Sequence, residues 1–502
     1  MSSRGSGYDV VILGGGPAGC VLASRLSEDP GRSVCLIEAG PDYGPYDDGR
    51  WPPDLLYANE LATSHDWGLA GGWPSWRAKV IGGCSSHNGC FVAWGSPDDF
   101  IEWVEAGDPG WSYAELDPYR RRCEVTLRVR PSRLEDLEPF MRMGLDAAAE
   151  TGIPVLDDFD DPNASEGAAP IKVNAVGDIR WNAAFAYLDP ARERQNLTVM
   201  SDTLIDKLRF DGDRGTAAVV HAAGELEIES DLFVLAAGAY GTPAILLRSG
   251  IGPADDLART SVAVRTDLPG VGQNLTDHPR VEVVYRPTDA LLGRTEEHVA
   301  THPARAQTLI KARSKVSSSS AWDLHVMMRL RRPLSNDAGQ ALGDPLAHVY
   351  VHAMKPASRG SVRIATSDPD ALPIVDHGFL TDGAGNDSRA LRAGIALARR
   401  LATTDVMRGL LREEIAPGRT AGDEEMAAYM MTSVGGYWHP VGTCKMGPTG
   451  DSDAVVDATG RLRGSENVYV ADASIMPTIP RANTNLLVVA IAERIARSLS
   501  NR

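Results

Sequence analysis

The stretch YDVVILGGGPAGCVLASRL, residues 8–26, decides the fold of this 502-residue chain. Its first six residues, 8–13, are mostly apolar and β-branched, which predicts a short strand buried on both faces. Gly14, Gly16 and Gly19 follow in G-x-G-x-x-G spacing and lead into a helical stripe. In such a turn the first glycine permits the tight backbone, the second admits a pyrophosphate, and the third lets helix and strand pack closely. The free N–H groups at the helix N-terminus complete a phosphate-binding site.

The segment SVCLIEAG, residues 33–40, predicts a second strand that ends near Glu38. An acidic side chain about 20 residues past the glycines is where a dinucleotide-binding unit contacts the ribose. Strand, glycine triplet, helix, strand and acid occur here in that order. We therefore predict a Rossmann-like α/β domain that binds a dinucleotide. The motif by itself leaves FAD and NAD open, and a glycine-rich turn without a ligand is the alternative.

Length and composition limit the remaining classes of protein. A chain of 502 residues is long for one hydrophobic core, so we expect two domains, side by side or interleaved. The formal net charge of −17 argues against nucleic acid and anionic membranes as partners. No segment is apolar enough to span a bilayer and the N-terminal residues lack signal-peptide features, which predicts a cytoplasmic protein. The six cysteines have no zinc-type spacing, which predicts free thiols and no metal site.

A second glycine-rich segment, RAKVIGGCSSHNGCFVAWG at residues 77–95, follows the dinucleotide unit. Its residues Gly82 and Gly83 can bring the backbone close to a planar cofactor, because glycine carries no Cβ. Together with Ser85 and Ser86 they predict a second backbone cradle, which would hold part of the same ligand.

This segment resembles the first signature of the glucose-methanol-choline (GMC) oxidoreductase family. Its string GGCSSHN is most similar to that of choline oxidase within the family. The resemblance implies that the cofactor is FAD, that His87 bonds covalently to the flavin, and that Asn88 contacts the flavin. A non-covalent FAD with His87 packed beside the ring is the alternative.

Two further segments resemble the same family. LFVLAAGAYGTPAILLRSGIG, residues 232–252, predicts a buried strand and then a helix opened by Thr242 and Pro243, and its later part resembles the second GMC signature. ENVYVADASIMPTIP, residues 466–480, resembles the closing FAD-binding segment, which implies that Asp472 lies near the ribityl chain or the pyrophosphate. These segments imply the GMC fold, a Rossmann-like FAD-binding domain with an interleaved α+β substrate-binding cap.

The resemblance divides the chain into two discontinuous domains. It implies that residues 1–100, 196–280 and 432–502 form the FAD-binding domain. Residues 101–195 and 281–431 would form the cap. The resemblance is strong over the cofactor segments and weak over the cap, so it says least about the part that would select the substrate.

The resemblance also implies a catalytic pair. VGGYWHPVGTCKMG, residues 434–447, contains the family's His-Pro-Val-Gly-Thr string, which maps the catalytic histidine to His439. Its partner maps to Asn483 in PTIPRANTN, with Asn485 as the nearest competitor. A histidine titrates near working pH and can take a hydroxyl proton or stabilise an alkoxide. An asparagine offers a neutral donor that holds the substrate oxygen without adding a second base.

These residues together imply an FAD-dependent oxidoreductase acting on CH–OH donors. We expect it to oxidise a primary alcohol to an aldehyde by hydride transfer to flavin N5, with O2 or a quinone-type molecule as the electron acceptor. Choline oxidase or dehydrogenase activity proper is one alternative, and a hydroxynitrile lyase on the same fold is another. The oligomeric state stays open, a homodimer included.

Choline itself is disfavoured as the substrate. A trimethylammonium group needs an aromatic cage or a carboxylate. The positions aligned with the family's carboxylate, residues 306–308, hold Ala, Gln and Thr, and Tyr437 stands where choline oxidase has a smaller residue. We therefore expect a neutral or differently shaped alcohol.

Three further expectations concern where particular side chains lie in the fold. Asp277 and His278, in LTDHP, are expected to serve structure rather than chemistry. The C-terminal helix LLVVAIAERIARSL should pack its apolar stripe inward and turn Glu493 and Arg494 to solvent. Four tryptophans near the flavin loop either line an aromatic pocket or fill the core: Trp67, Trp73, Trp76 and Trp94.

Overall fold

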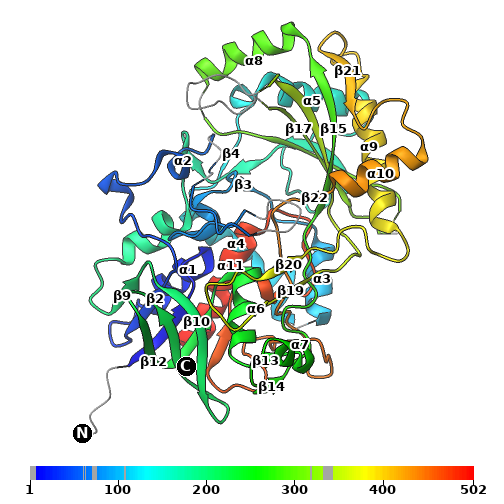
Figure 1. The fold of residues 1–502 in the computed structure, drawn as a ribbon. Coiled ribbons are helices and arrows are strands. Elements are labelled where there is room, and N and C mark those ends of the chain that lie inside the picture. Colours follow the sequence, from blue (N-terminus) through cyan, green and yellow to red (C-terminus); the bar gives the residue numbers. More distant parts are fainter. Residues whose placement is uncertain are drawn as a thin grey trace.

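Two β-sheets organise the molecule, one in each lobe of Figure 1. The computed structural model describes residues 7–59, 62, 64–69, 76–106, 109–302, 304–316, 319–331 and 343–501. Trp73, one of the four tryptophans considered above, lies outside the described residues. Within them, no helix is both long enough and apolar enough to cross a membrane.

The lower sheet is built around β1 (Tyr8–Leu13), which spans the predicted first strand. β1 pairs in parallel with β2 (Val34–Ile37) on one side and with β12 (Glu225–Leu235) on the other. Four more strands extend the sheet: β9 (Leu197–Met200) beside β2, β23 (Val468–Val470) beside β12, and the antiparallel strands β10 (Leu204–Asp211) and β11 (Arg214–His221). All four residues of β2 are buried, because the sheet is covered on both faces. The predicted Rossmann-like layer is confirmed.

Three helices pack together in the lower lobe: α1 (Pro17–Leu26), α4 (Tyr113–Thr126) and α11 (Thr484–Ser500). The prediction that Glu493 faces solvent is wrong, because α1 and α4 both bring an arginine to it. Glu493 is 2% exposed and lies 2.8 Å from Arg25 Nη2 and 3.5 Å from Arg122 Nη1. Arg494 is half-buried, with its guanidinium 4.7 Å from the centre of the Trp111 ring.

The helix after β12 begins earlier than predicted. α6 spans Gly238–Arg248, so Thr242 and Pro243 lie inside it rather than at its start. Proline has no N–H to donate to the carbonyl four residues earlier, which belongs to Ala239. Thr443 Oγ1 donates a hydrogen bond to that carbonyl oxygen at 2.7 Å. A tertiary contact thus supplies the donor that the helix lacks.

The upper sheet is antiparallel. Its strands, in spatial order, are β21 (Leu411–Ala416), β15 (Pro279–Pro287), β18 (Leu346–Ala353), β17 (Leu324–Arg331), β16 (Thr308–Ala312) and β5 (Gly167–Pro170), with β22 (Gly435–Gly436) also beside β15. One face packs against α5 (Pro139–Glu150) and α9 (Asn386–Ala402). Because side chains alternate along a strand, every second residue points to the opposite face.

The boundaries of the two predicted domains stay predictions. The family resemblance assigns residues 101–195 to the cap. Among them, α4 packs against α11 of the lower lobe, whereas β5 is a strand of the upper sheet and α5 packs against that sheet. The six cysteines are free thiols, as predicted, and five of them are buried; Cys84 is half-buried.

Candidate active site

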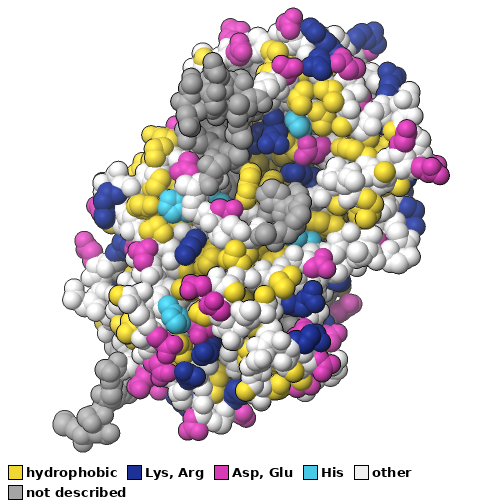
Figure 2. Space-filling model, viewed as in Figure 1, with side chains coloured by type: hydrophobic (Ala, Val, Ile, Leu, Met, Phe, Trp, Pro, Cys, Tyr) yellow, Lys and Arg dark blue, Asp and Glu magenta, His cyan; other side chains and the backbone are white. Residues whose placement is uncertain are grey.

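A cavity of about 1370 Å³ is lined by residues from both lobes. Its walls include the turn between β1 and α1, the loop 83–89, strands β15, β17 and β18, and the segments 437–440 and 483–485. Figure 2 shows a face of the molecule that is hollowed between the lobes, with Lys and Arg side chains on the side of the upper lobe.

The predicted glycine turn lies in the wall of this cavity. Gly14 has a φ of +115°, and a Cβ there would lie 2.6 Å from Ala236 O. A Cβ on Gly19 would lie 1.9 Å from Gly14 O, so α1 approaches β1 this closely only because residue 19 is glycine. Gly19 packs behind the turn, whereas Gly14 and Gly16 line the cavity. Around Gly16 the only atom within 4 Å of a Cβ is Ala236 O at 3.9 Å, so the space beside it is open to a ligand.

Glu38 follows β2 and also lines the cavity. Its Oε2 accepts a hydrogen bond from Gly15 N at 2.8 Å and its Oε1 from Gly40 N at 2.9 Å. Burial raises the pKa of Glu38 to about 7, because the two backbone donors offset the loss of solvation only in part. Each carboxylate oxygen keeps a second acceptor position for a ligand hydroxyl.

The loop predicted to meet the flavin rests directly on the glycine turn. A Cβ on Gly83 would lie 2.7 Å from Gly16 Cα, which brings the two glycine-rich segments together. Gly83 lines the cavity, while Gly82 and Ser86 lie behind it and shape the loop. Gly82 has a φ of +84°, and Ser86 Oγ donates to Ile81 O at 2.9 Å.

His87 and Asn88 also line the cavity, and both are half-buried. Asn88 Oδ1 accepts a hydrogen bond from Cys90 N at 3.0 Å, which fixes the side chain. Cys84 and Arg77, which sequence reasoning did not single out, lie in the same wall. Burial by itself would raise the pKa of Cys84, but Arg77 and His87 outweigh it and lower that pKa to about 6.

Asp472 joins two segments at the cavity wall. Its Oδ2 accepts from Gly238 N at 2.8 Å and from Thr242 Oγ1 at 2.6 Å. Its Oδ1 accepts from the backbone and the hydroxyl of Ser474 at 2.8 and 2.6 Å. The carboxylate is therefore engaged by the protein, and Asp472 holds the start of α6 against the segment after β23.

His439 and Asn483 meet in the wall of the same cavity. Both side chains are buried, and Asn483 Nδ2 lies 3.2 Å from His439 Nε2. Asn485, the competitor for this role, lines the cavity too, but the hydrogen bond to His439 comes from Asn483.

His278 determines which nitrogen of His439 carries the proton. His278 Nε2 lies 3.0 Å from Pro480 O, and a carbonyl oxygen can only accept, so this nitrogen is the donor. Burial lowers the pKa of His278 to about 3, so the ring is neutral and its Nδ1 is an acceptor. His439 Nδ1 lies 3.0 Å from that atom and must donate to it. His439 Nε2 therefore keeps its lone pair, to which Asn483 Nδ2 donates.

Asp277 holds the backbones of both histidines. Its Oδ1 accepts from His278 N at 2.7 Å and from His439 N at 2.9 Å. Burial raises the pKa of Asp277 to about 6, and the backbone N–H of His439 and the charge of Arg77 oppose that rise. The motif LTDHP was expected to serve structure, and here that structure orients His439.

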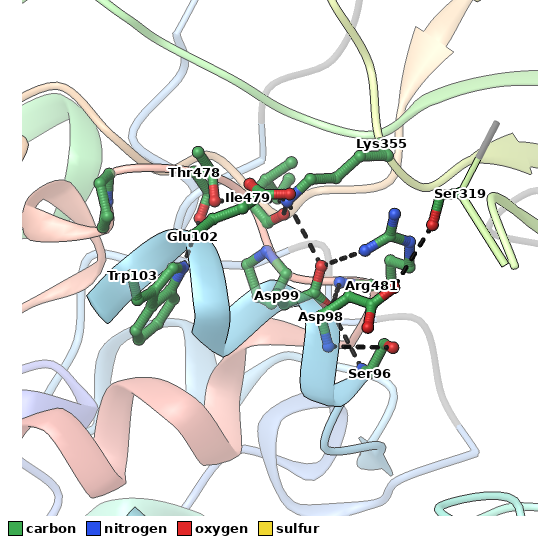
Figure 3. A network of polar contacts seen from close by, with 12 residues as sticks. Ser96, Asp98, Asp99, Glu102, Trp103, Ser319, Lys355, Thr478, Ile479 and Arg481 are labelled. Atoms are coloured by element: carbon green, nitrogen blue, oxygen red, sulfur yellow. Dashed lines mark hydrogen bonds and ion pairs between the residues drawn. The ribbon is translucent and has the colours of Figure 1, made fainter. Parts of the chain in front are cut away.

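The loop that carries Asn483 is anchored by Asp99 on α3 (Pro97–Ala106), as Figure 3 shows. Asp99 Oδ2 accepts from Arg481 N at 2.8 Å, and its Oδ1 accepts from the Arg481 guanidinium at 2.5 Å. Lys355 Nζ lies 3.3 Å from the same Oδ1 and donates to Ile479 O at 3.1 Å. These contacts bring one buried carboxylate and two cations to the base of the loop.

Replacing Asp99 with Asn is expected to displace this loop. Loss of the charge leaves Arg481 without its buried partner, which should lower the free energy of unfolding by about 3 kcal/mol. Flavin reduction should slow as well, because Asn483 follows the anchored residues. Thermal unfolding and anaerobic flavin reduction measure the two effects. Asp98→Asn, at a neighbouring half-buried position, is the control; equal behaviour of the two variants would refute the anchoring role.

The residues in the wall of the cavity fit FAD. The phosphates of a dinucleotide can lie at the open side of Gly16 and the uncapped N-terminus of α1. Its ribose can donate hydrogen bonds to the carboxylate of Glu38. His87 and Asn88 line the same continuous space.

Comparison with known proteins agrees with this geometry. Two family models described as GMC oxidoreductase match residues 8–280 and 356–492. The chain is 32% identical to choline oxidase from Arthrobacter globiformis, over 97% of this chain and 93% of the relative. It is 32% identical to 5-(hydroxymethyl)furfural oxidase from Methylovorus sp., over 98% of each chain.

Solved structures extend the comparison. The crystal structure of pyridoxine 4-oxidase from Mesorbium loti is 30% identical, with a TM-score of 0.85 and 99% of each chain covered. A formate oxidase superposes with the same TM-score of 0.85 at 22% identity, covering 100% of this chain and 99% of the other, which shows the shared fold alone.

The predicted fold and cofactor are thereby confirmed. The family models cover more than half of the chain, and the relatives match along almost its whole length. The chain therefore belongs to the GMC oxidoreductase family and is an FAD-dependent oxidoreductase that acts on CH–OH donors.

Proposed function

We propose that this protein oxidises a primary alcohol to an aldehyde, with His439 as the base and Asn483 as the hydrogen-bond donor to the substrate oxygen. The observation that carries the proposal is that His439 Nε2 is unprotonated, because Nδ1 donates to His278, and that this acceptor lies 3.2 Å from the donor Asn483 Nδ2. A base and a neutral donor at one point are what an alcohol hydroxyl needs when it loses its proton. The covalent link at His87 stays a prediction.

His439 and Asn483 have different roles in the proposed reaction. The substrate hydroxyl lies beside both side chains, replaces the hydrogen bond between them and gives its proton to His439 Nε2. The protonated ring and Asn483 Nδ2 then donate to the oxygen and stabilise its developing negative charge. FAD, when bound, supplies the acceptor for the hydride that leaves the carbinol carbon.

Tyr437 favours a primary alcohol, which is unbranched at the carbinol carbon. Its ring centre lies 3.7 Å from that of His352 and 4.4 Å from that of His439, so it is a fixed wall beside the base. A carbinol carbon with a single substituent fits beside such a wall more readily than a branched one.

Anaerobic flavin reduction tests the proposal. The holoenzyme is mixed with choline and with aliphatic, aryl and sugar alcohols while the visible absorbance of the flavin is followed. Bleaching by a primary alcohol is the expected result, and readmission of air then distinguishes an oxidase from a dehydrogenase. Reduction by no alcohol in the panel would count against the proposal and in favour of the lyase alternative.

The rate of flavin reduction is expected to be nearly the same at pH 6 as at pH 8. Burial lowers the pKa of His439 well below its ordinary value, and the neighbouring His278 and His352 lower it further. A base stops working only when the pH falls through its own pKa, so this one stays unprotonated over about pH 6 to 8. Stopped-flow reduction at saturating substrate measures the profile. A tenfold loss between pH 8 and pH 6 would contradict it.

A further inference from the structure

One face of the upper sheet turns toward the cavity and carries cationic side chains. The residues of this face lie in three cross-strand rows: Arg280, His352 and His325; Glu282, Tyr350 and Met327; and Val284, His348 and Arg329. Residues of the alternate set, such as Met328 and Val351, contact α5 and α9 instead. Four of the first set line the cavity: Arg280, Met327, Arg329 and Tyr350.

Arg280 has a counter-ion. Its Nη2 lies 3.1 Å from Glu282 Oε1, and its guanidinium lies 5.1 Å from the centre of the Tyr350 ring and 5.0 Å from that of Trp438. The other oxygen of Glu282 lies 2.7 Å from His348 Nδ1. The one carboxylate in these three rows is therefore engaged by Arg280 and His348.

Arg329 has no such partner. It is half-buried and lines the cavity, and its guanidinium makes neither a hydrogen bond nor an ion pair with the described residues. The positive charge of Arg329 acts on Arg305, a buried residue in the same wall. Burial and the Arg329 guanidinium together lower the pKa of Arg305 to about 9. Arg305 itself donates to the backbone at Gly89 O, at 3.1 Å.

Neither of the nearby acidic residues in the lining, Asp136 and Glu138, forms an ion pair with Arg329. Asp136 is held by Arg133 through two hydrogen bonds of 2.8 and 3.0 Å. Glu138 lies in the lining and acts on Arg305, with no ion pair to it within 4.0 Å. Arg329 is thus left half-buried in the cavity wall with no carboxylate paired to it among the described residues.

A half-buried guanidinium is poorly solvated and needs an acceptor. Its five N–H donors form a planar fork that suits the two oxygens of a carboxylate or a phosphate. We propose that the substrate is an alcohol that also carries a carboxylate or phosphate group, and that Arg329 binds this anion while the hydroxyl lies against His439. This deepens the proposed function and rests on it.

The surrounding wall agrees with an anionic substrate that has an apolar body. Tyr350, Trp438 and Met327 line the cavity beside the cations and offer ring faces and a flexible apolar side chain. A trimethylammonium group would be repelled by the uncompensated charge of Arg329, which disfavours choline. The sequence led us to expect a neutral or differently shaped alcohol, and an anionic alcohol is the differently shaped one that we propose.

Calorimetric titration of the holoenzyme with four inert ligands tests the anion site without any turnover. Benzoate or phenyl phosphate should bind at least about tenfold more tightly than benzamide or benzyltrimethylammonium, as expected for a charge-assisted hydrogen bond. Whichever of the two anions binds more tightly shows whether the site prefers a carboxylate or a phosphate. Binding of neither anion more tightly than benzamide would overturn the inference.

Variants assign the effect to Arg329. Arg329→Gln should abolish the anion preference and Arg329→Glu should reverse it in favour of the ammonium ligand. Both should fold, because the guanidinium holds no other described residue in place. Arg286→Gln is the matched control, since it removes a charge from half-buried Arg286 of β15, which is paired with Glu413 at 2.7 Å outside the cavity. Wild-type anion binding by Arg329→Gln would overturn the assignment.

Flavin reduction separates this inference from the proposed function. 4-(Hydroxymethyl)benzoate and benzyl alcohol differ only in the acid group. Reduction by both at equal efficiency would leave the alcohol oxidation standing and overturn the anionic substrate. Tight benzoate binding without reduction by any alcohol would support the anion site and contradict the proposed function.

Discussion

His439→Ala is expected to slow flavin reduction by the substrate about 100- to 10,000-fold, the range over which a positioned general base contributes. The lone pair of His439 Nε2 is the acceptor that His278 and Asn483 keep in place, and alanine removes it. Anaerobic stopped-flow absorbance measures the rate, and the flavin content of the purified variant shows whether the cofactor site is intact.

Two controls make this result specific. His302→Ala alters an exposed histidine that lines the same cavity, and it should reduce the flavin at nearly the wild-type rate. Added imidazole should restore part of the rate of His439→Ala, because it can enter the vacated space as a base. Wild-type turnover by His439→Ala would refute the proposed mechanism.

Gly19→Ala is expected to lower both the stability of the fold and the retention of FAD. Its new Cβ would lie 1.9 Å from Gly14 O, a backbone atom that cannot rotate away. α1 must therefore move from β1, at a cost of about 1–3 kcal/mol or more. The same movement disturbs the phosphate-binding turn, so the variant should both unfold at a lower temperature and retain less FAD.

Gly16→Ala separates the two effects. Its Cβ would meet only Ala236 O, at 3.9 Å, so the fold should be as stable as before. The methyl group would instead enter the space for the cofactor phosphates and lower FAD retention. Gly224→Ala has no neighbour within 4 Å and serves as the neutral control. Wild-type thermal stability and FAD content in Gly19→Ala would contradict the role given to this glycine.

The elements of the cofactor site could be predicted because their signals are local. β1 spans the predicted residues 8–13, and Gly14, Gly16 and Glu38 lie together in one wall, because strand, turn and helix follow one another within about 30 residues of sequence. His439 and Asn483 came from family resemblance, since no periodicity distinguishes a reactive histidine from a buried one.

Contacts between residues that are distant in the sequence were not predicted. Glu493 reads as a solvent-facing helix residue until α1 and α4 bring Arg25 and Arg122 to it. Pro243 reads as a helix start until Thr443, 200 residues away, satisfies the carbonyl of Ala239 inside α6.

The sequence by itself determined the FAD-binding layer and the family of the enzyme, because both are encoded in short strings whose backbone needs are local. The tertiary structure alone decided which nitrogen of His439 carries the lone pair and that Arg329 lines the cavity without a counter-ion among the described residues. His278 acquires its role through His439 and Pro480, and Arg329 acquires its role because no described residue pairs a carboxylate with its guanidinium. A hydrophobic pattern encodes which face of an element is buried, whereas the meeting of particular charges depends on how the elements cross in space.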